Sequence, residues 1–240
     1  MWETLSREIR DYFDLDPDGF LKGDAARRAY NGQIVRVFRE VWPNLEPGDK
    51  DPYLDFVLDE HTFGTNTYRG FTQATLRSIM YIREIEKYFD PSTVDYLLDF
   101  GPGYGNNVRV WHRLFQTPVI KMCDIKILHP ISKYYLSKHT FSPKMNIEWI
   151  HPGEIEEPPN AKNSLFFATH SLNECHISRR ESIVPWLGAF EHVYIVYNDE
   201  FDGINNIEYF ENLANGLPHE KVEITYNEIT AKWSLIATGL

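Results

Sequence analysis

The chain has 240 residues, of which 42% are hydrophobic, and a formal net charge of −11. This composition supports a sizeable core and argues against wholesale disorder. The acidic charge argues against a nucleic-acid partner, because the basic dipeptides Arg27-Arg28 and Arg179-Arg180 are isolated and form no basic stripe for phosphate.

The chain shows no targeting or membrane-spanning pattern. Its N-terminus lacks a basic segment followed by an apolar one, and no apolar run approaches the roughly 20 residues that a membrane helix needs. Two cysteines, Cys123 and Cys175, match no zinc spacing; they could form one disulfide, but nothing else indicates secretion. We therefore expect a cytoplasmic protein without a membrane partner.

Residues 1–90 are expected to form a helical N-terminal extension. Helical patterns cover residues 3–13, 24–41 and 72–89, and the last has apolar residues at three- and four-residue spacing. A loop rich in turn formers spans residues 44–52. The segment around Tyr68, Arg69 and Phe71 could form a lid over a substrate, cap a sheet or make a dimer contact, so a homo-oligomer stays open.

Residues 91–240 have an alternating α/β pattern. Seven runs predict strands: Val94–Phe100, Pro118–Cys123, Asn146–Ile150, Ser164–Thr169, Val193–Tyr197, Lys221–Thr225 and Lys232–Ala237. Helices or long loops separate the first five, as parallel βαβ units require, whereas the short link 226–230 predicts a hairpin between the last two. We expect an open, mostly parallel seven-stranded sheet whose last strand is antiparallel.

A glycine-rich turn follows the first of these strands directly. Gly101, Gly103 and Gly105 lie between the strand and a helix expected over residues 106–115, so a ligand can approach the main chain closely. A dinucleotide site of the G-x-G-x-x-G type would place its third glycine at position 106, where Asn106 stands. Asp99 is poorly suited to a pyrophosphate, but its carboxylate can pair with the cationic amino group of a methionine moiety.

A second acidic residue ends the next strand. Asp124 lies 23 positions after Gly101, and an acid about 20 residues after such a loop can bind ribose hydroxyls. Nicotinamide-binding proteins share this feature. Asp124 therefore predicts a nucleoside ligand without identifying it.

The D-x-G-x-G-x-G pattern and the downstream acid resemble the motifs of class I S-adenosylmethionine-dependent methyltransferases. The resemblance covers residues 94–240 and implies a Rossmann-like sheet, S-adenosylmethionine as cofactor and S-adenosylhomocysteine as product. It assigns the methionine part to the first strand end and glycine loop, the ribose to the second strand end and the adenine to the third. The residues are Asp99, Phe100, Gly101, Pro102, Gly103, Tyr104 and Gly105, then Asp124 and Ile125, then His151. The family often has an acid at the third position, for which Glu154 is a substitute here.

A narrower set of motifs resembles bacterial proteins assigned as sugar O-methyltransferases. The set comprises Gly64 with the 72–89 helix, the glycine-tyrosine-glycine loop, Cys123-Asp124-Ile125, Tyr134-Tyr135-Leu136 and Ser171-Leu172-Asn173-Glu174. This resemblance implies a small-molecule acceptor with a sugar hydroxyl.

Methyl transfer to an oxygen needs alignment and a base that takes the proton. The fourth strand ends at a polar cluster in which His170 is the first candidate base, with Glu174 and His176 as alternatives or orienting partners. His170 could equally be a core or capping histidine, and Ser171 or Asn173 a helix N-cap. Acids after the fifth strand, Asp199 and Glu200, could bind Mg²⁺, but spacing assembles no ligand set and solvated loop acids are favoured.

Three other functions stay open at this point. A methyltransferase acting on a protein or an amine keeps the cofactor, although no Asn/Asp-Pro-Pro-Tyr/Phe motif follows the fourth strand. A nicotinamide-dependent oxidoreductase is disfavoured by Asp99 and Asn106, and its Tyr134-x-x-x-Lys138 spacing follows the wrong strand. A non-catalytic module that kept only the fold is the third, because fold alone does not prove function.

Overall fold

The computed structural model describes residues 2–30, 53, 63, 67–68, 70–228 and 231–240. They form two compact units. The first contains residues up to Glu84 together with Gly103–Gln116 and Lys126–Phe141. The second contains Ile85–Pro102, Thr117–Ile125 and Ser142–Leu240.

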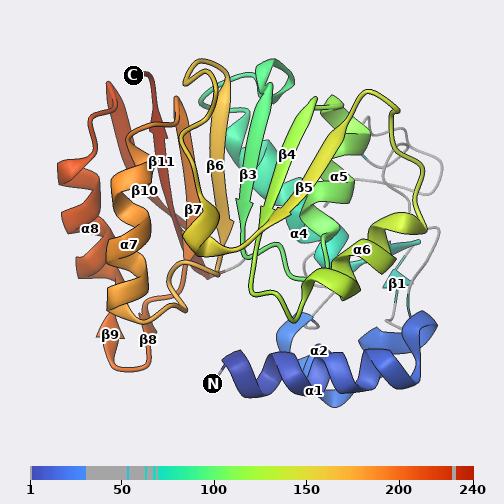
Figure 1. The fold of residues 1–240 in the computed structure, drawn as a ribbon. Coiled ribbons are helices and arrows are strands. Elements are labelled where there is room, and N and C mark those ends of the chain that lie inside the picture. Colours follow the sequence, from blue (N-terminus) through green and yellow to red (C-terminus); the bar gives the residue numbers. More distant parts are fainter. Residues whose placement is uncertain (1, 31–52, 54–62, 64–66, 69, 229–230) are drawn as a thin grey trace. The chain divides into compact units, whose positions relative to one another are not determined.

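The second unit is built on one seven-stranded sheet (Figure 1). Its strand order is β10-β11-β7-β6-β3-β4-β5. The strands are β3 (Tyr96–Phe100), β4 (Val119–Cys123), β5 (Asn146–Ile150), β6 (Ser164–Thr169), β7 (His192–Tyr197), β10 (Lys221–Asn227) and β11 (Lys232–Thr238). β3 to β7 pair in parallel, and β11 runs antiparallel to both β7 and β10. The prediction of a mostly parallel sheet with one antiparallel strand, the last in the chain, is confirmed.

One face of the sheet carries the core of this unit. Alternate strand residues such as Leu98, Phe166 and Ile195 have no exposed surface and pack with helix residues Ile183 and Phe210. These come from α7 (Ile177–Leu187) and α8 (Asn206–Gly216), which lie against the same face (Figure 1). Period-two alternation along the strands thus meets the apolar stripes of two helices.

The first unit is mainly helical. It contains α1 (Trp2–Leu15), η1 (Pro17–Lys22), α2 (Asp24–Tyr30), the short strands β1 (Thr67–Tyr68) and β2 (Phe71–Thr72), α4 (Gln73–Ile85), α5 (Asn106–Phe115) and α6 (His129–Ser137). The predicted helix 24–41 is described only to Tyr30; the rest of it, and the loop 44–52, lie outside the described residues. The predicted helix 72–89 ends at Ile85, four residues early.

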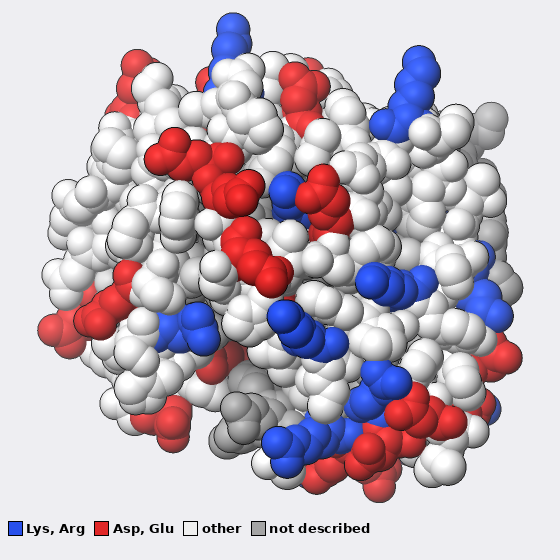
Figure 2. All heavy atoms as spheres, in the orientation of Figure 1, with Lys and Arg blue, Asp and Glu red and all other residues white. Residues whose placement is uncertain are grey.

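Surface charges of both signs alternate on α1. Arg10 pairs with Asp14 at 2.9 Å, and Arg28 of α2 pairs with Glu8 at 2.6 Å. Blue and red side chains accordingly stand side by side along the lower edge of Figure 2. Basic residues that face acids in this way do not make a continuous phosphate-binding stripe.

The cysteines and the helix lengths bear on the disulfide and membrane-helix hypotheses from the sequence. Cys123 and Cys175 are free thiols, so the disulfide considered above is not formed. Within the described part of the chain, no helix has the length and apolar character to cross a membrane.

Candidate functional site

The carboxyl ends of the parallel strands bring most of the predicted site residues to one edge of the sheet. Asp99 lies in β3, which pairs with β4 on one side and β6 on the other. Asp124, His151 and His170 each follow the last residue of β4, β5 and β6. In an open α/β sheet, ligands bind beyond this edge, at the point where strand order reverses. Here that point lies between β3 and β6.

The glycine turn after β3 needs its glycines. Gly101, Gly103 and Gly105 have φ values of 73°, 57° and 97°, a region that side chains with a Cβ rarely adopt. Gly101 donates its N–H to the carbonyl of Cys123 at 2.8 Å, which continues the pairing with β4. A Cβ built on Gly101 would overlap with the Cβ of Ser171, so this glycine also makes room for the loop after β6.

Asp99 is a buried carboxylate without a partner. Its side chain has no exposed surface, and neither carboxylate oxygen has a hydrogen bond. Burial, and secondly the negative charge of Asp124, raise the pKa of Asp99 well above its ordinary value. A buried acid of this kind is costly unless something pairs with it, so it marks a place where a ligand donor fits.

The carboxylate of Asp124 lies at the end of β4. The residue is half-buried, and its Oδ1 accepts a hydrogen bond from the backbone N–H of Ile125 at 2.7 Å. Its own N–H donates to the carbonyl of Ile150 at 3.1 Å. An ionised carboxylate has about four lone-pair sites and accepts several hydrogen bonds at once.

His151 and Glu154, the third pair of candidates, form a capping box. The Nδ1 of His151 accepts from the N–H of Gly153 at 3.3 Å, and Glu154 accepts from the N–H of His151 at 2.7 Å. The box fixes the chain direction after β5. Both side chains therefore have a local role in addition to the adenine contact that the sequence suggests for His151.

The remaining loop residues differ in what their side chains do. Phe100 is buried and stacks on Phe166 with centroids 5.9 Å apart. Tyr104, which belongs to the first unit, is 4% exposed and packs edge-on against Tyr135 at 4.8 Å and Phe20 at 5.8 Å. At these two positions only the backbone stays available to a ligand, whereas their rings stabilise the fold.

The loop after β6 holds the candidate bases. His170 is half-buried with φ 68°, and its N–H donates to the carbonyl of Val196 at 2.9 Å. Such a backbone at a site edge is a recognised sign of function, although histidine tolerates it better than most residues. Glu174 is also half-buried.

Helix α7 begins at Ile177, later than the N-cap candidates Ser171 and Asn173 had suggested. Its N-cap is His176, whose Nδ1 accepts from the N–H of Ser178 at 3.3 Å, and not Ser171 or Asn173. Ser171 instead donates its hydroxyl to the carbonyl of Phe100. His176 is thus an exposed capping residue, which satisfies one free donor of the helix.

Sequence reasoning missed Arg180, the buried cation of this region. Its side chain has no exposed surface and donates to Asn206 Oδ1 at 2.7 Å and to the carbonyl of Cys175 at 2.9 Å. The signal was present in the sequence: Arg180, Ile183 and Leu187 share one helix face, and both apolar members of that face are buried.

The described side chains support neither the nicotinamide hypothesis nor the metal-site hypothesis. Tyr134 donates its hydroxyl to Asp18 at 2.5 Å and Lys138 pairs with Asp18 at 3.5 Å, so the Tyr-x-x-x-Lys spacing forms a surface contact in the first unit. Among the described residues, no three His, Cys, Asp or Glu side chains gather into a metal-binding group.

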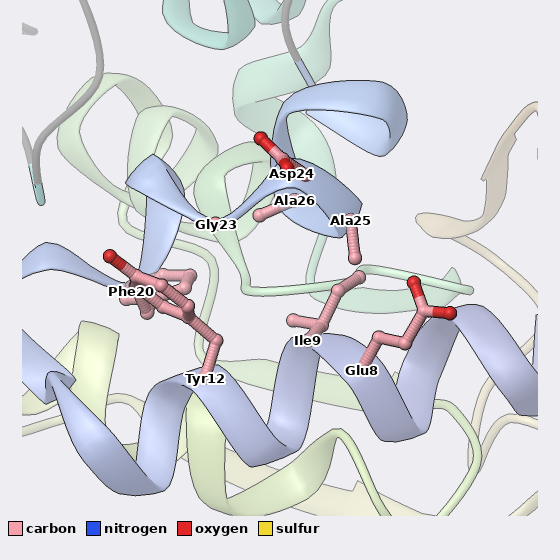
Figure 3. A pocket seen from close by; sticks show the side chains of 8 residues that line it. All are labelled: Glu8, Ile9, Tyr12, Phe20, Gly23, Asp24, Ala25 and Ala26. Atoms are coloured by element: carbon pink, nitrogen blue, oxygen red, sulfur yellow. The ribbon is translucent and has the colours of Figure 1, made fainter.

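A pocket lies among α1, η1 and α2 of the first unit (Figure 3). Ile9, Tyr12 and Phe20 line it together with the acids Glu8 and Asp24. It contains none of the residues predicted for the cofactor or the chemistry.

Solved structures share this fold. Neither protein-family models nor curated protein sequences match the chain. The methyltransferase domain of bacterial CtHen1 superposes with a TM-score of 0.52 at 11% identity, over 68% of this chain and 97% of that one. A protein from Methanococcus maripaludis, assigned as an S-adenosylmethionine-dependent methyltransferase, superposes with a TM-score of 0.50 at 15% identity, over 68% of this chain and 84% of that one. The mitomycin 7-O-methyltransferase MmcR superposes with a TM-score of 0.50 at 12% identity, over 70% of this chain and 56% of that one.

The chain has the Rossmann-like methyltransferase fold. The strand order, the single antiparallel strand and the glycine turn at the switch point all agree with this result. At such low identity the likeness extends to the fold alone, and the activities named above belong to those proteins.

Proposed function

We propose that this protein is an S-adenosylmethionine-dependent methyltransferase that methylates an oxygen of a sugar or another small hydroxylated molecule. Residues 91–240 form its catalytic domain and residues 1–90 an extension. The observation that carries the proposal is the unpartnered, fully buried carboxylate of Asp99 beside a positive-φ glycine turn. The methyltransferase folds of the structures above support it.

The residues at the sheet edge fit this cofactor chemically. Asp99 offers an unsatisfied carboxylate for a cationic amino group, and Asp124 has acceptor sites suited to ribose hydroxyls. Gly101, which lies in the same compact unit as these two acids, presents backbone without a side chain at the start of the turn. When bound, S-adenosylmethionine supplies an activated methyl group on a sulfonium leaving group.

The loop after β6 is proposed to handle the acceptor. His170 takes the proton from the acceptor hydroxyl, because a neutral imidazole is a base at physiological pH. Glu174 or His176 orients it or replaces it in that role. A small uncharged acceptor suits the net charge of −11 better than a phosphate polymer does.

The first test is calorimetric titration of the full chain with S-adenosylmethionine, S-adenosylhomocysteine and NAD. We expect micromolar binding of the first two and loss of that binding in Asp124→Ala, because the ribose then loses its acceptor. Binding of NAD alone would refute the methyltransferase proposal. If none of the three binds, the fold serves as a non-catalytic interaction module.

His170→Ala tests the base. With a labelled methyl donor and a panel of sugars, phenols, amines and a protein acceptor, we expect about 100-fold slower transfer, the usual scale of lost general-base catalysis. Binding of S-adenosylhomocysteine should stay unchanged, since His170 lies after a different strand from Asp99 and Asp124. Unchanged turnover would exclude His170, and transfer only to amines or protein would correct the acceptor class.

A further inference from the structure

Arg180 joins two loops at the carboxyl edge of the sheet. Its Nε and Nη2 donate to the carbonyls of Cys175 and Asn173 in the loop after β6, and its Nη1 donates to the side chain of Asn206. Asn206 opens α8 and donates its N–H to the carbonyl of Asp199, just after β7, at 2.9 Å. One side chain therefore connects the segments that follow two neighbouring strands.

Burial of the Arg180 guanidinium in this position is energetically unfavourable for the fold. Arg180 has no exposed surface, and its acceptors among the described residues are uncharged carbonyl and amide oxygens. The ring of Tyr209, 4.8 Å from the guanidinium carbon, adds a cation–π contact. Removing a cation from water without a carboxylate partner is unfavourable, so a purely structural core would favour an apolar residue here.

The loop that Arg180 holds is itself in an unfavourable conformation. His170 at its start has a left-handed backbone, and the amide group of Asn173 is fully buried with neither its oxygen nor its nitrogen bonded. In a free loop the Asn173 amide would turn towards water or another partner. Such arrangements persist only where the surrounding structure enforces them, and they concentrate at functional sites.

Bonds at the two ends of the loop enforce it. Ser171 is tied to the glycine turn through the carbonyl of Phe100, and Asn173 and Cys175 are tied to Arg180. The first bond fixes the loop to the cofactor side of the site. The second fixes it to α8 and to the end of β7.

We propose that Arg180 is a positioning residue that fixes the loops after β6 and β7 for methyl transfer. The inference rests on the proposed function for its catalytic meaning. A planar guanidinium can direct three donors to three separate acceptors, which a lysine ammonium cannot reproduce in the same geometry. Arg180 therefore acts on the acceptor side and leaves the cofactor contacts of β3 and β4 intact.

Hydrogen exchange measured by mass spectrometry on the full chain tests the proposal. In Arg180→Lys and Arg180→Met, amides of residues 170–176 and 199–206 should both exchange at least about tenfold faster, since charge-assisted bonds that link them are lost. β3 and β4 should keep their protection. Arg179→Met, which removes the exposed neighbouring arginine on the same helix, should change neither loop.

Two further readouts separate positioning from simple core packing. The affinity for S-adenosylhomocysteine should stay within about twofold of the original in Arg180→Lys, while methyl transfer falls at least about tenfold through kcat. Faster exchange in only one loop, or equally throughout the sheet, would overturn the proposal. If the original protein does not bind the cofactor, the proposed function fails, yet the exchange pattern still decides whether Arg180 couples the two loops.

Discussion

Gly101→Ala is expected to lower the free energy of unfolding by about 3 kcal/mol and to abolish cofactor binding. A left-handed backbone costs a residue with a Cβ about 1–2 kcal/mol, and forcing extra atoms into a packed site costs about 1–3 kcal/mol. Both apply at Gly101, which has φ 73° and whose added Cβ would overlap with Ser171. Denaturant unfolding and titration with S-adenosylhomocysteine measure the two effects.

Gly203→Ala is the matched control for this substitution. Gly203 has φ 77°, but a Cβ built there meets nothing within 4 Å. Gly203→Ala should therefore lower the free energy of unfolding only by the backbone contribution, about 1 kcal/mol, and this variant should bind the cofactor normally. Adding Ser171→Gly to Gly101→Ala should recover part of the stability, because the overlapping atom is removed. Equal losses in both alanine variants would show that Ser171 does not restrict the glycine turn.

The sheet was predictable because each strand carries its own local signal. Apolar runs bounded by turn formers placed β5 and β6 at their observed limits, Asn146–Ile150 and Ser164–Thr169. The glycine spacing predicted a turn that the chain makes with three left-handed residues. Sequence order and connection length then sufficed for the direction of β11, since a short link permits only an antiparallel neighbour.

The end of α4 was not predictable from periodicity, because tertiary contacts decide it. Apolar spacing continues to Phe89, but the helix ends at Ile85 and the chain turns. The ring of Phe89 stacks on His192 at 3.8 Å, and Lys221 lies over the ring of Tyr88 at 4.9 Å. These partners lie more than 100 residues further along the chain and leave no trace in a local pattern.

Other features were missed although the sequence contains a signal for them. Asp202-Gly203 joins β8 (Glu200–Phe201) to β9 (Ile204–Asn205), and both turn residues have positive φ, as a two-residue Asp-Gly hairpin requires. The N-cap at His176 is different. Ser171 and Asn173 are better capping residues in general, but the hydroxyl of Ser171 donates to the carbonyl of Phe100, and the backbone carbonyl of Asn173 accepts from Arg180.

Asp99→Asn is expected to stabilise the ligand-free protein while it weakens cofactor binding about ten- to hundredfold, the range for a lost charge-assisted hydrogen bond. The folded-state pKa of Asp99 is raised by burial and by the Asp124 charge. A raised pKa means that its contribution to stability is complete below the unfolded-state pKa and declines as pH rises through the folded-state value. The advantage of asparagine in chemical unfolding should therefore grow from acid to alkaline pH.

Asp95→Asn provides the control within the same segment of chain. Asp95 precedes β3, is exposed and accepts a hydrogen bond from Asn163 Nδ2 at 3.2 Å, so its substitution should affect neither stability nor binding strongly. Calorimetry in two buffers of different ionisation enthalpy adds a second signature. At a pH between the ordinary and the raised pKa of Asp99, a cationic ligand that pairs with its carboxylate displaces a proton, and this proton release should be absent in Asp99→Asn. Equal release in both proteins would place the cationic group of the ligand away from Asp99. The fold would then stand, but the buried carboxylate would need another partner.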